Sequence, residues 1–149
     1  MNLKRLKDLR EDNDFTQVEL AKKIDCNPNT YSSWENGYAL IPIICLDQLS
    51  CLYGVSFGYI VGLTKTKNPT IGKLDMQLLR EHMKEERKKR RLTQEDVAKI
   101  LKVGKTTYHD YETGKYDIKL DKLIMLTDYY KINIDVFCGK IRESEIFTK

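Results

Sequence analysis

The side chains of this sequence that could do chemistry are chiefly amides and hydroxyls at regular positions. Gln17 and Gln94 each follow a threonine that can begin a helix, and a short polar set, Asn29, Ser32 and Ser33, follows the first of them. Such groups donate and accept hydrogen bonds without carrying charge. They suit recognition of a polar partner better than catalysis.

Catalytic and metal-binding chemistry has little support. The two histidines, His82 and His109, have no evident nucleophile or ligand partner. The four cysteines form no CxxC pair, and each matches a non-cysteine in the internal repeat described next, so neither a zinc site nor a disulfide is indicated. We expect no enzyme, no cofactor and no metal, in a reduced intracellular protein.

One stretch of the chain occurs twice. Residues 16–37, TQVELAKKIDCNPNTYSSWENG, align without a gap on residues 93–114, TQEDVAKILKVGKTTYHDYETG, and eight of the 22 positions are identical. Average composition gives roughly one or two such matches by chance. We therefore predict two tandem domains, 1–63 and 75–149, the second with a short C-terminal tail, joined by a basic and polar linker, 64–74.

Apolar spacing and capping residues predict five short helices in the first copy. Thr16 and Glu19 form a capping box. Asn27 and Pro28 form an N-cap followed by a proline in the first helical position. The helices expected are one ending near residue 13, one starting at Thr16, one from 28 to about 36, one over 43–53 with Leu46, Leu49 and Leu52 as its apolar face, and one over 57–62.

The second copy repeats this plan with changes. Its first helix is expected over about 75–89, Thr93 and Asp96 form a weaker capping box, and Gly104 stands where Asn27 caps the first copy. Asn133 replaces Ser56 as the cap of the last helix. The fold class is thus all-α, with two tandem five-helix domains.

Charge and hydropathy place the protein in the cytoplasm. The N-terminus is charged throughout and lacks the apolar core of a signal peptide, and no apolar run is long enough to span a membrane. Residues 1–63 carry six basic and eight acidic side chains, whereas residues 75–149 carry seventeen basic and fourteen acidic ones. A polyanion should therefore be attracted to the second half first.

The repeated stretch resembles the lambda-repressor-like helix-turn-helix domain of the Cro/cI (XRE-type) family of DNA-binding regulators. Both copies match its pattern, TQxxLA with TxYxxWENG in the first and TQxxVA with TxYxxYETG in the second. The resemblance implies that the second helix lies across the DNA backbone and the third enters the major groove. It also implies buried ion pairs, Arg10 with Glu35 and Arg87 with Glu112, that tie the first helix to the third.

In the first copy, Gln17 lies in the first turn of its helix, where the free N–H groups attract a phosphate. The resemblance places Pro28, Asn29 and Ser33 on bases and Asn36 on the backbone phosphate. Asparagine pairs bidentately with adenine, but proline cannot hydrogen-bond a base. Direct reading then falls mainly on Asn29, Ser32 and Ser33. The candidate DNA-binding residues are Gln17, Asn27, Pro28, Asn29, Thr30, Ser32, Ser33 and Asn36.

The second copy has more charge and a less suitable reading face. Lys105 can pair with guanine or a phosphate, whereas Asp110 near a polyanion is more often unfavourable, and Thr113 replaces the phosphate-binding asparagine. The basic run leading into the second helix is expected to contact the DNA backbone. The candidates are Lys88, Lys89, Arg90, Gln94, Lys105, Thr106, Thr107, His109, Asp110 and Thr113.

We therefore expect a sequence-specific transcriptional regulator of double-stranded DNA, most simply a repressor. The two domains could imitate a dimer, with third helices about 34 Å apart on one DNA face. Alternatively, one copy binds DNA while the other forms a homodimer. A rival from another class is a protein-interaction module, of antitoxin or anti-repressor type, that keeps the fold and binds a protein.

Overall fold

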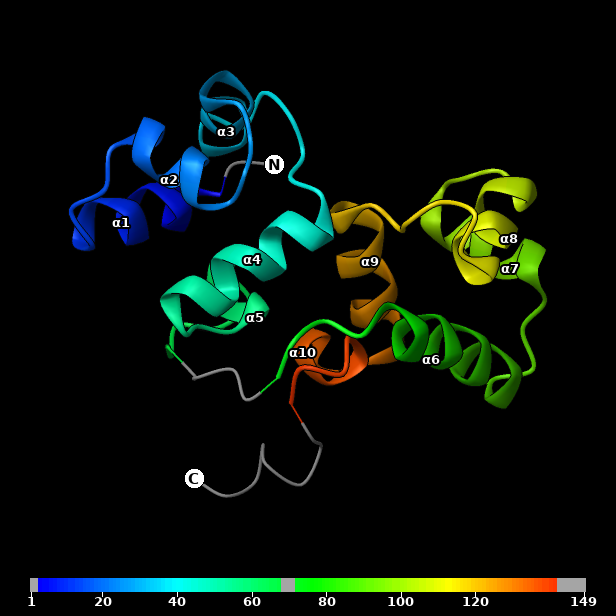
Figure 1. The fold of residues 1–149 in the computed structure, drawn as a ribbon. Coiled ribbons are helices and arrows are strands. Elements are labelled where there is room, and N and C mark those ends of the chain that lie inside the picture. Colours follow the sequence, from blue (N-terminus) through cyan, green and yellow to red (C-terminus); the bar gives the residue numbers. More distant parts are fainter. Residues whose placement is uncertain (1–2, 68–71, 142–149) are drawn as a thin grey trace. The chain divides into compact units, whose positions relative to one another are not determined.

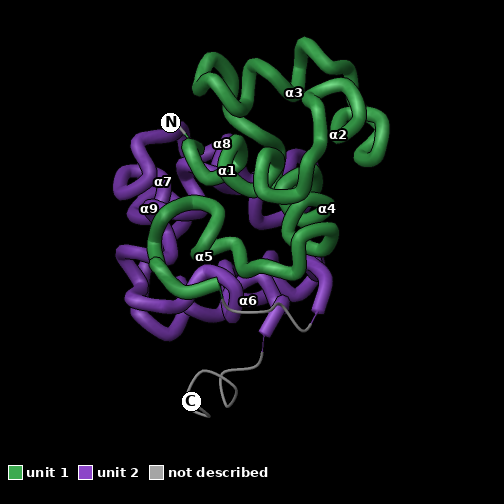
Figure 2. The backbone as a smooth tube through the Cα atoms, turned by 90° about the vertical axis from the view of Figure 1, so that its left-hand side faces the viewer, with its two compact units in different colours: residues 1–70 green, residues 71–149 purple. Residues whose placement is uncertain are grey.

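The structure, a computed structural model, describes residues 3–67 and 72–141 of the 149-residue chain. It divides into two compact units, Met1–Thr70 and Ile71–Lys149, which are coloured separately in Figure 2. Within the described residues every regular element is a helix, in the order α1 to α10 (Figure 1). The all-α fold expected from the sequence is confirmed.

Unit 1 is built from five short helices around one core. Leu6, Leu20, Tyr31 and Leu46 are fully buried and come from four different helices, so the apolar stripes of these helices share a single interior. The helices are α1 (Lys4–Asp12), α2 (Gln17–Lys23), α3 (Pro28–Glu35), α4 (Ile43–Tyr53) and α5 (Phe57–Ile60).

Unit 2 repeats this order. Its core contains Met83, Val97, Tyr108 and Leu123, which are also fully buried and again come from four helices. The helices are α6 (Met76–Lys89), α7 (Gln94–Leu101), α8 (Lys105–Thr113), α9 (Leu120–Tyr130) and α10 (Ile134–Phe137). The first of these helices, α6, begins one residue after the start of the predicted range, about 75–89, and ends at its last residue.

Capping side chains fix where the helices begin. The Thr16 hydroxyl accepts from the Glu19 amide at 3.1 Å, and the Glu19 carboxylate accepts from the Thr16 amide at 2.8 Å. Thr93 and Asp96 make the same two bonds at 3.1 and 2.8 Å, so the second capping box is complete rather than weaker. The aspartate is one methylene shorter than glutamate but still reaches the amide. Asn27 caps α3, and Gly104 begins α8 without a side-chain cap.

The expected apolar face of α4 was wrong at one position. Leu46 and Leu49 are fully buried, but 41% of Leu52 is exposed. A spacing of three residues falls short of the 3.6 residues of a helical turn, so the third leucine of such a series has rotated away from the core. Ile43 and Ser50 complete the buried face instead.

A buried ion pair joins the first helix of each unit to its third. Arg10 donates from Nε and Nη2 to the Glu35 carboxylate at 3.0 and 2.8 Å, and its Nη1 donates to the Phe15 carbonyl at 2.9 Å. Arg87 makes the corresponding bonds to Glu112, again at 3.0 and 2.8 Å. This arrangement confirms the ion pairs that the resemblance implies.

The end of the second repeat folds back on the segment that precedes α6. Lys140 is buried, and its Nζ donates to the Gly72 carbonyl at 3.3 Å. The Asp75 amide donates to the Cys138 carbonyl at 3.1 Å. Lys140, the first residue of the expected C-terminal tail (140–149), therefore packs within unit 2. Residues 142–149 lie outside the described part.

The ion pairs predict a loss of stability at acid pH. Burial alone would raise the pKa of Glu35, but the hydrogen bonds and the charge of Arg10 lower it, and Arg87 lowers the pKa of Glu112 in the same way. Carboxyls with depressed pKa values stabilise the fold above the unfolded value of about 4.3, and this contribution disappears as pH falls through the folded pKa.

Glu35→Gln should therefore destabilise unit 1 at pH 7 by about 3 kcal/mol, because it leaves a buried guanidinium without its counter-charge. The same change should make the stability of unit 1 less sensitive to pH between about 5 and 3. Urea unfolding across that range measures both effects, with Asp8→Asn, at an exposed position of α1, as the control. Equal pH dependence in the wild type and Glu35→Gln would contradict the role of the pair.

The capping boxes predict a smaller effect. Thr93→Ala should lower the free energy of unfolding of unit 2 by about 1 kcal/mol, because the Asp96 amide loses its acceptor. Thr93→Ser keeps the hydroxyl and serves as the control. Chemical denaturation that showed the same loss for both variants would assign the effect to the threonine methyl group.

Candidate nucleic-acid interface

The third helix of unit 1 separates its core side from a polar side. Tyr31 and Trp34 are buried, whereas Asn29 and Asn36 are exposed and Ser33 is half-buried. The 3.6-residue period puts the buried pair on one face and the polar set on the other. The structure therefore gathers the first-copy candidates of α3 on one outward surface, which also contains Pro28, Thr30 and Ser32.

Internal hydrogen bonds occupy part of that surface. The Ser33 hydroxyl donates to the Thr30 carbonyl at 2.7 Å, and the Asn36 amide donates to the Ser32 hydroxyl at 3.1 Å. The Asn27 side-chain oxygen accepts from the backbone N–H of Asn29 and so caps the helix. The side chain of Asn29 makes no hydrogen bond within the described part of the chain. It is the side chain on α3 best placed to read a base edge.

The first-turn glutamines are tied to the buried ion pairs. Gln17 Nε2 lies 3.4 Å from Glu35 Oε1, and a hydrogen bond from Gln94 helps to lower the pKa of Glu112. Both glutamines are half-buried at the start of their helices. Their amides are thus oriented by the carboxylate that holds the third helix, a connection that the sequence did not reveal.

In unit 2 the second and third helices are joined by a further bond. His109 Nδ1 donates to the Gln94 side-chain oxygen at 3.2 Å. The corresponding residue of unit 1 is Ser32, which is bonded along α3 instead. Lys105 and Thr106 are exposed at the start of α8, as is Thr107. Asp110 is half-buried, and the Thr113 hydroxyl lies 3.4 Å from the Asp110 carbonyl.

The two units have opposite charges at the corner between the first and second helices. Unit 2 has a basic corner, defined as Lys88, Lys89 and Arg91, and all three are exposed. The matching residues of unit 1 form an acidic corner, Glu11, Asp12 and Asp14, which is exposed as well. Both corners lie directly before the helix whose N-terminus is the expected phosphate contact.

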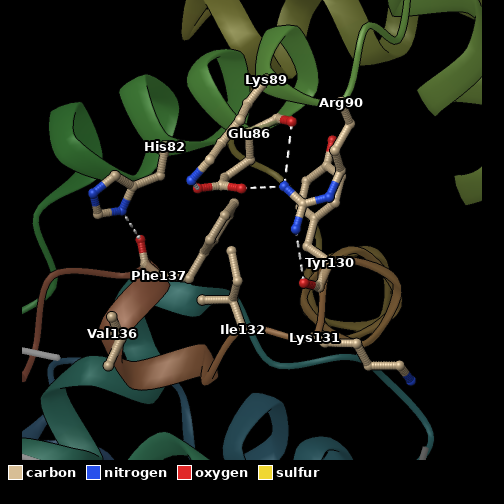
Figure 3. A pocket seen from close by; sticks show the side chains of 9 residues that line it. All are labelled: His82, Glu86, Lys89, Arg90, Tyr130, Lys131, Ile132, Val136 and Phe137. Carbon is tan, nitrogen blue, oxygen red and sulfur yellow. Dashed lines mark hydrogen bonds and ion pairs between the residues drawn. The ribbon is translucent and has the colours of Figure 1, made fainter.

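Arg90 lies within the basic run but has a different environment. Its guanidinium donates to the Glu86 carboxylate and, at 2.9 Å, to the Tyr130 carbonyl (Figure 3). It also lies over the Tyr130 ring, 4.4 Å from the centroid. These contacts commit Arg90 to packing α6 against α9. We therefore leave Arg90 out of the set that we propose to contact DNA.

Sequence reasoning missed two exposed tyrosines beside the third helices. Tyr38 follows α3 and is 86% exposed, and Tyr116 follows α8 and is 60% exposed. They escaped notice because the 77-residue shift matches Tyr38 with Lys115, so the two tyrosines differ in register by one residue. An aromatic residue soon after the glycine that ends each third helix was the available signal.

No group of three or more His, Cys, Asp or Glu side chains in the described part of the chain could hold a metal ion. Among the same residues, no helix is long and apolar enough to cross a membrane.

Comparisons with known proteins find the same two segments. The family model for helix-turn-helix proteins, HTH_3, matches residues 6–60 and 83–137. Antitoxin PezA of Streptococcus pneumoniae serotype 4 is 35% identical over 66 residues, which make up 44% of this chain and 42% of the antitoxin. The uncharacterized HTH-type transcriptional regulator YobD of Bacillus subtilis is 32% identical over 77 residues, or 52% of this chain and 69% of YobD.

The match thus spans less than half of the antitoxin and about two thirds of YobD. No solved structure matches the chain.

The environment of Arg90 predicts that it stabilises unit 2. Arg90→Gln should lower the free energy of unfolding by about 1–2 kcal/mol, because it removes charge-assisted hydrogen bonds and a cation–π contact. Lys88→Gln, at an exposed position two residues earlier, should change stability by less than about 0.5 kcal/mol. Thermal unfolding of the two variants makes the comparison, and equal stability would contradict the assignment.

Proposed function

The chain belongs to the helix-turn-helix family HTH_3, of the Cro/cI type, and we propose that it is a sequence-specific regulator of double-stranded DNA without enzymatic activity. The observation that carries this proposal is the exposed polar face of α3, with the free Asn29 side chain, beside an oriented Gln17. In this proposal α3 and α8 enter the major groove. The bound protein then represses transcription from that site.

We assign most of the phosphate attraction to unit 2. Its basic corner precedes α7, and Lys105 at the start of α8 adds a further exposed cation. Each contact of this kind releases counterions from DNA and strengthens binding independently of base sequence. The acidic corner of unit 1 would repel the same backbone, so unit 2 is the stronger attachment point.

We assign most of the base reading to unit 1. The outward face of α3 is made of amides and hydroxyls, with Asn29 free to pair. On α8, His109 is bonded to Gln94 and Asp110 would place a carboxylate near the DNA. The two halves of the bound site should therefore differ in sequence.

A second candidate function has its own support. The acidic corner of unit 1, together with the similarity to an antitoxin, favours a protein-binding role for that unit. In this alternative, unit 2 alone binds DNA, and unit 1 binds a protein partner or a second copy of the chain. Substitution of each glutamine separately distinguishes the two functions.

Gln17→Ala and Gln94→Ala should each weaken DNA binding by about fivefold to tenfold, because each removes an oriented phosphate contact. Fluorescence anisotropy with a selected duplex measures the affinity, and thermal unfolding confirms that each variant is folded. If only Gln94→Ala weakens binding, the proposal that both units bind DNA is wrong, and the protein-binding alternative for unit 1 is favoured.

The basic corner predicts a change in salt dependence. Lys88→Gln with Lys89→Gln should reduce the slope of log affinity against log salt by about two units, since two phosphate contacts are lost. Glu11→Gln with Asp12→Gln, at the matching positions of unit 1, provides the control and should not reduce it. An unchanged slope for the lysine variant would make the basic corner an ordinary solvated surface.

A further inference from the structure

Unit 2 contains a pocket of about 360 Å³ on the side of α6 that faces α10. Figure 3 places Glu86, Lys89 and Arg90 along one edge and Ile132 with Val136 along the other. The Phe137 side chain lies between the two edges but is only 1% exposed, so it closes the floor of the pocket. The pocket therefore has a charged edge and an apolar edge.

The charged edge carries a net positive charge. The Glu86 carboxylate accepts from Arg90 and lies 3.8 Å from Lys89 Nζ, so two cations share one anion. The side chain of Lys89 is 76% exposed, which leaves its ammonium able to reach a bound group. Its distance from Glu86 is too long for a hydrogen bond, so an anion could replace that contact.

Two lining positions of the pocket carry larger side chains in unit 1. His82 and Val136 of the pocket correspond to Arg5 and Tyr59 after the 77-residue shift. The Arg5 guanidinium lies over the Tyr59 ring, 4.4 Å from its centroid, and donates to the Tyr59 and Thr64 carbonyls. The shorter His82 donates from Nδ1 to the Phe137 carbonyl at 2.8 Å.

We propose that this pocket binds a small aromatic anion, a single ring bearing a phosphate or a carboxylate. The ring packs against Ile132 and Val136, and the anionic group lies at the exposed ammonium of Lys89. The volume is at the lower end of the range for small-molecule sites.

Binding in this pocket has a consequence for DNA that rests on the proposed function. Lys89 belongs to both the pocket and the basic corner. An anion held by Lys89 competes with a DNA phosphate for the same ammonium, so the ligand lowers DNA affinity. The pocket is then an effector site within the DNA-binding unit itself.

The test is a titration of the full chain with phenyl phosphate, in the absence of DNA, monitored by the amide resonances in NMR spectra. Phenyl phosphate should shift resonances of residues 82–90 and 131–137 in a saturable manner. Inorganic phosphate and phenol, which each offer one half of the ligand, should bind more than about tenfold more weakly. Shifts spread equally over both units, no saturable shifts, or equal binding of inorganic phosphate would overturn the proposal.

Paired variants locate the site. His82→Arg with Val136→Tyr introduces the larger side chains that unit 1 has at these positions. Because they reduce the volume of the pocket, this double variant should bind phenyl phosphate more than about tenfold more weakly. Arg5→His with Tyr59→Val is the matched control in unit 1 and should leave that affinity unchanged. Lys89→Gln, at an exposed position where folding is not at risk, should also weaken binding. Unchanged binding in Lys89→Gln would overturn the proposed anion contact.

The effect on DNA is measured separately. At a fixed ionic strength, phenyl phosphate should lower the DNA affinity of the wild type but not that of His82→Arg with Val136→Tyr. Unchanged DNA affinity at saturation would overturn the competition, while the NMR shifts would still support the pocket. If the wild type did not bind DNA at all, the proposed function would be contradicted. The NMR titration would still test the pocket, because it contains no DNA.

Discussion

The buried ion pair between the first and third helices is the constraint on which each unit depends. The Glu35 carboxylate is 3% exposed and receives two hydrogen bonds from Arg10, which also holds the Phe15 carbonyl ahead of α2. One guanidinium therefore connects α1, the approach to α2 and the end of α3. A charge buried this deeply must keep its partner, so the end of α3 is held against α1 and against the residue that precedes α2. The first-turn glutamine, bonded to the same carboxylate, is oriented by the same constraint.

Because this frame is repeated, the surfaces of the two units could diverge without loss of the fold. Arg87 and Glu112 reproduce the bond lengths of the first pair to the carboxylate, yet the corner next to each frame has the opposite charge. The polar face of α3 suits hydrogen bonding to bases, and the basic corner of unit 2 suits attraction to phosphates. The two units also differ at the pocket on the side of α6 that faces α10, where His82 and Val136 replace the arginine and tyrosine of unit 1. The two units are thus one framework with two sets of surface chemistry.

The features that the sequence predicted are those that depend on neighbouring residues or on the repeat. Capping by Thr16 and Asn27 acts within three residues, and the ion pairs recur at the same spacing in both copies. The packing of Arg90 on Tyr130 could not be predicted, because it joins residues 40 positions apart and has no counterpart in unit 1. The exposure of Leu52 follows from the 3.6-residue helical period, and an aromatic residue follows the glycine after each third helix, so both features could have been predicted from the sequence. The pocket of unit 2 could not be found from the sequence, since its lining residues come from two segments, 82–90 and 130–137, that lie far apart along the chain.

The central claim is that two unlike units read one DNA site with unlike halves, and selection of bound duplexes from a random pool tests it most directly. Asymmetry in the reading faces of α3 and α8 predicts enriched sequences with two different half-sites, and the same selection with Asn29→Ala should lose base preference in one half only. Enrichment of a palindrome, or loss of preference in both halves, would contradict the account, as would a pool that shows no enrichment at all.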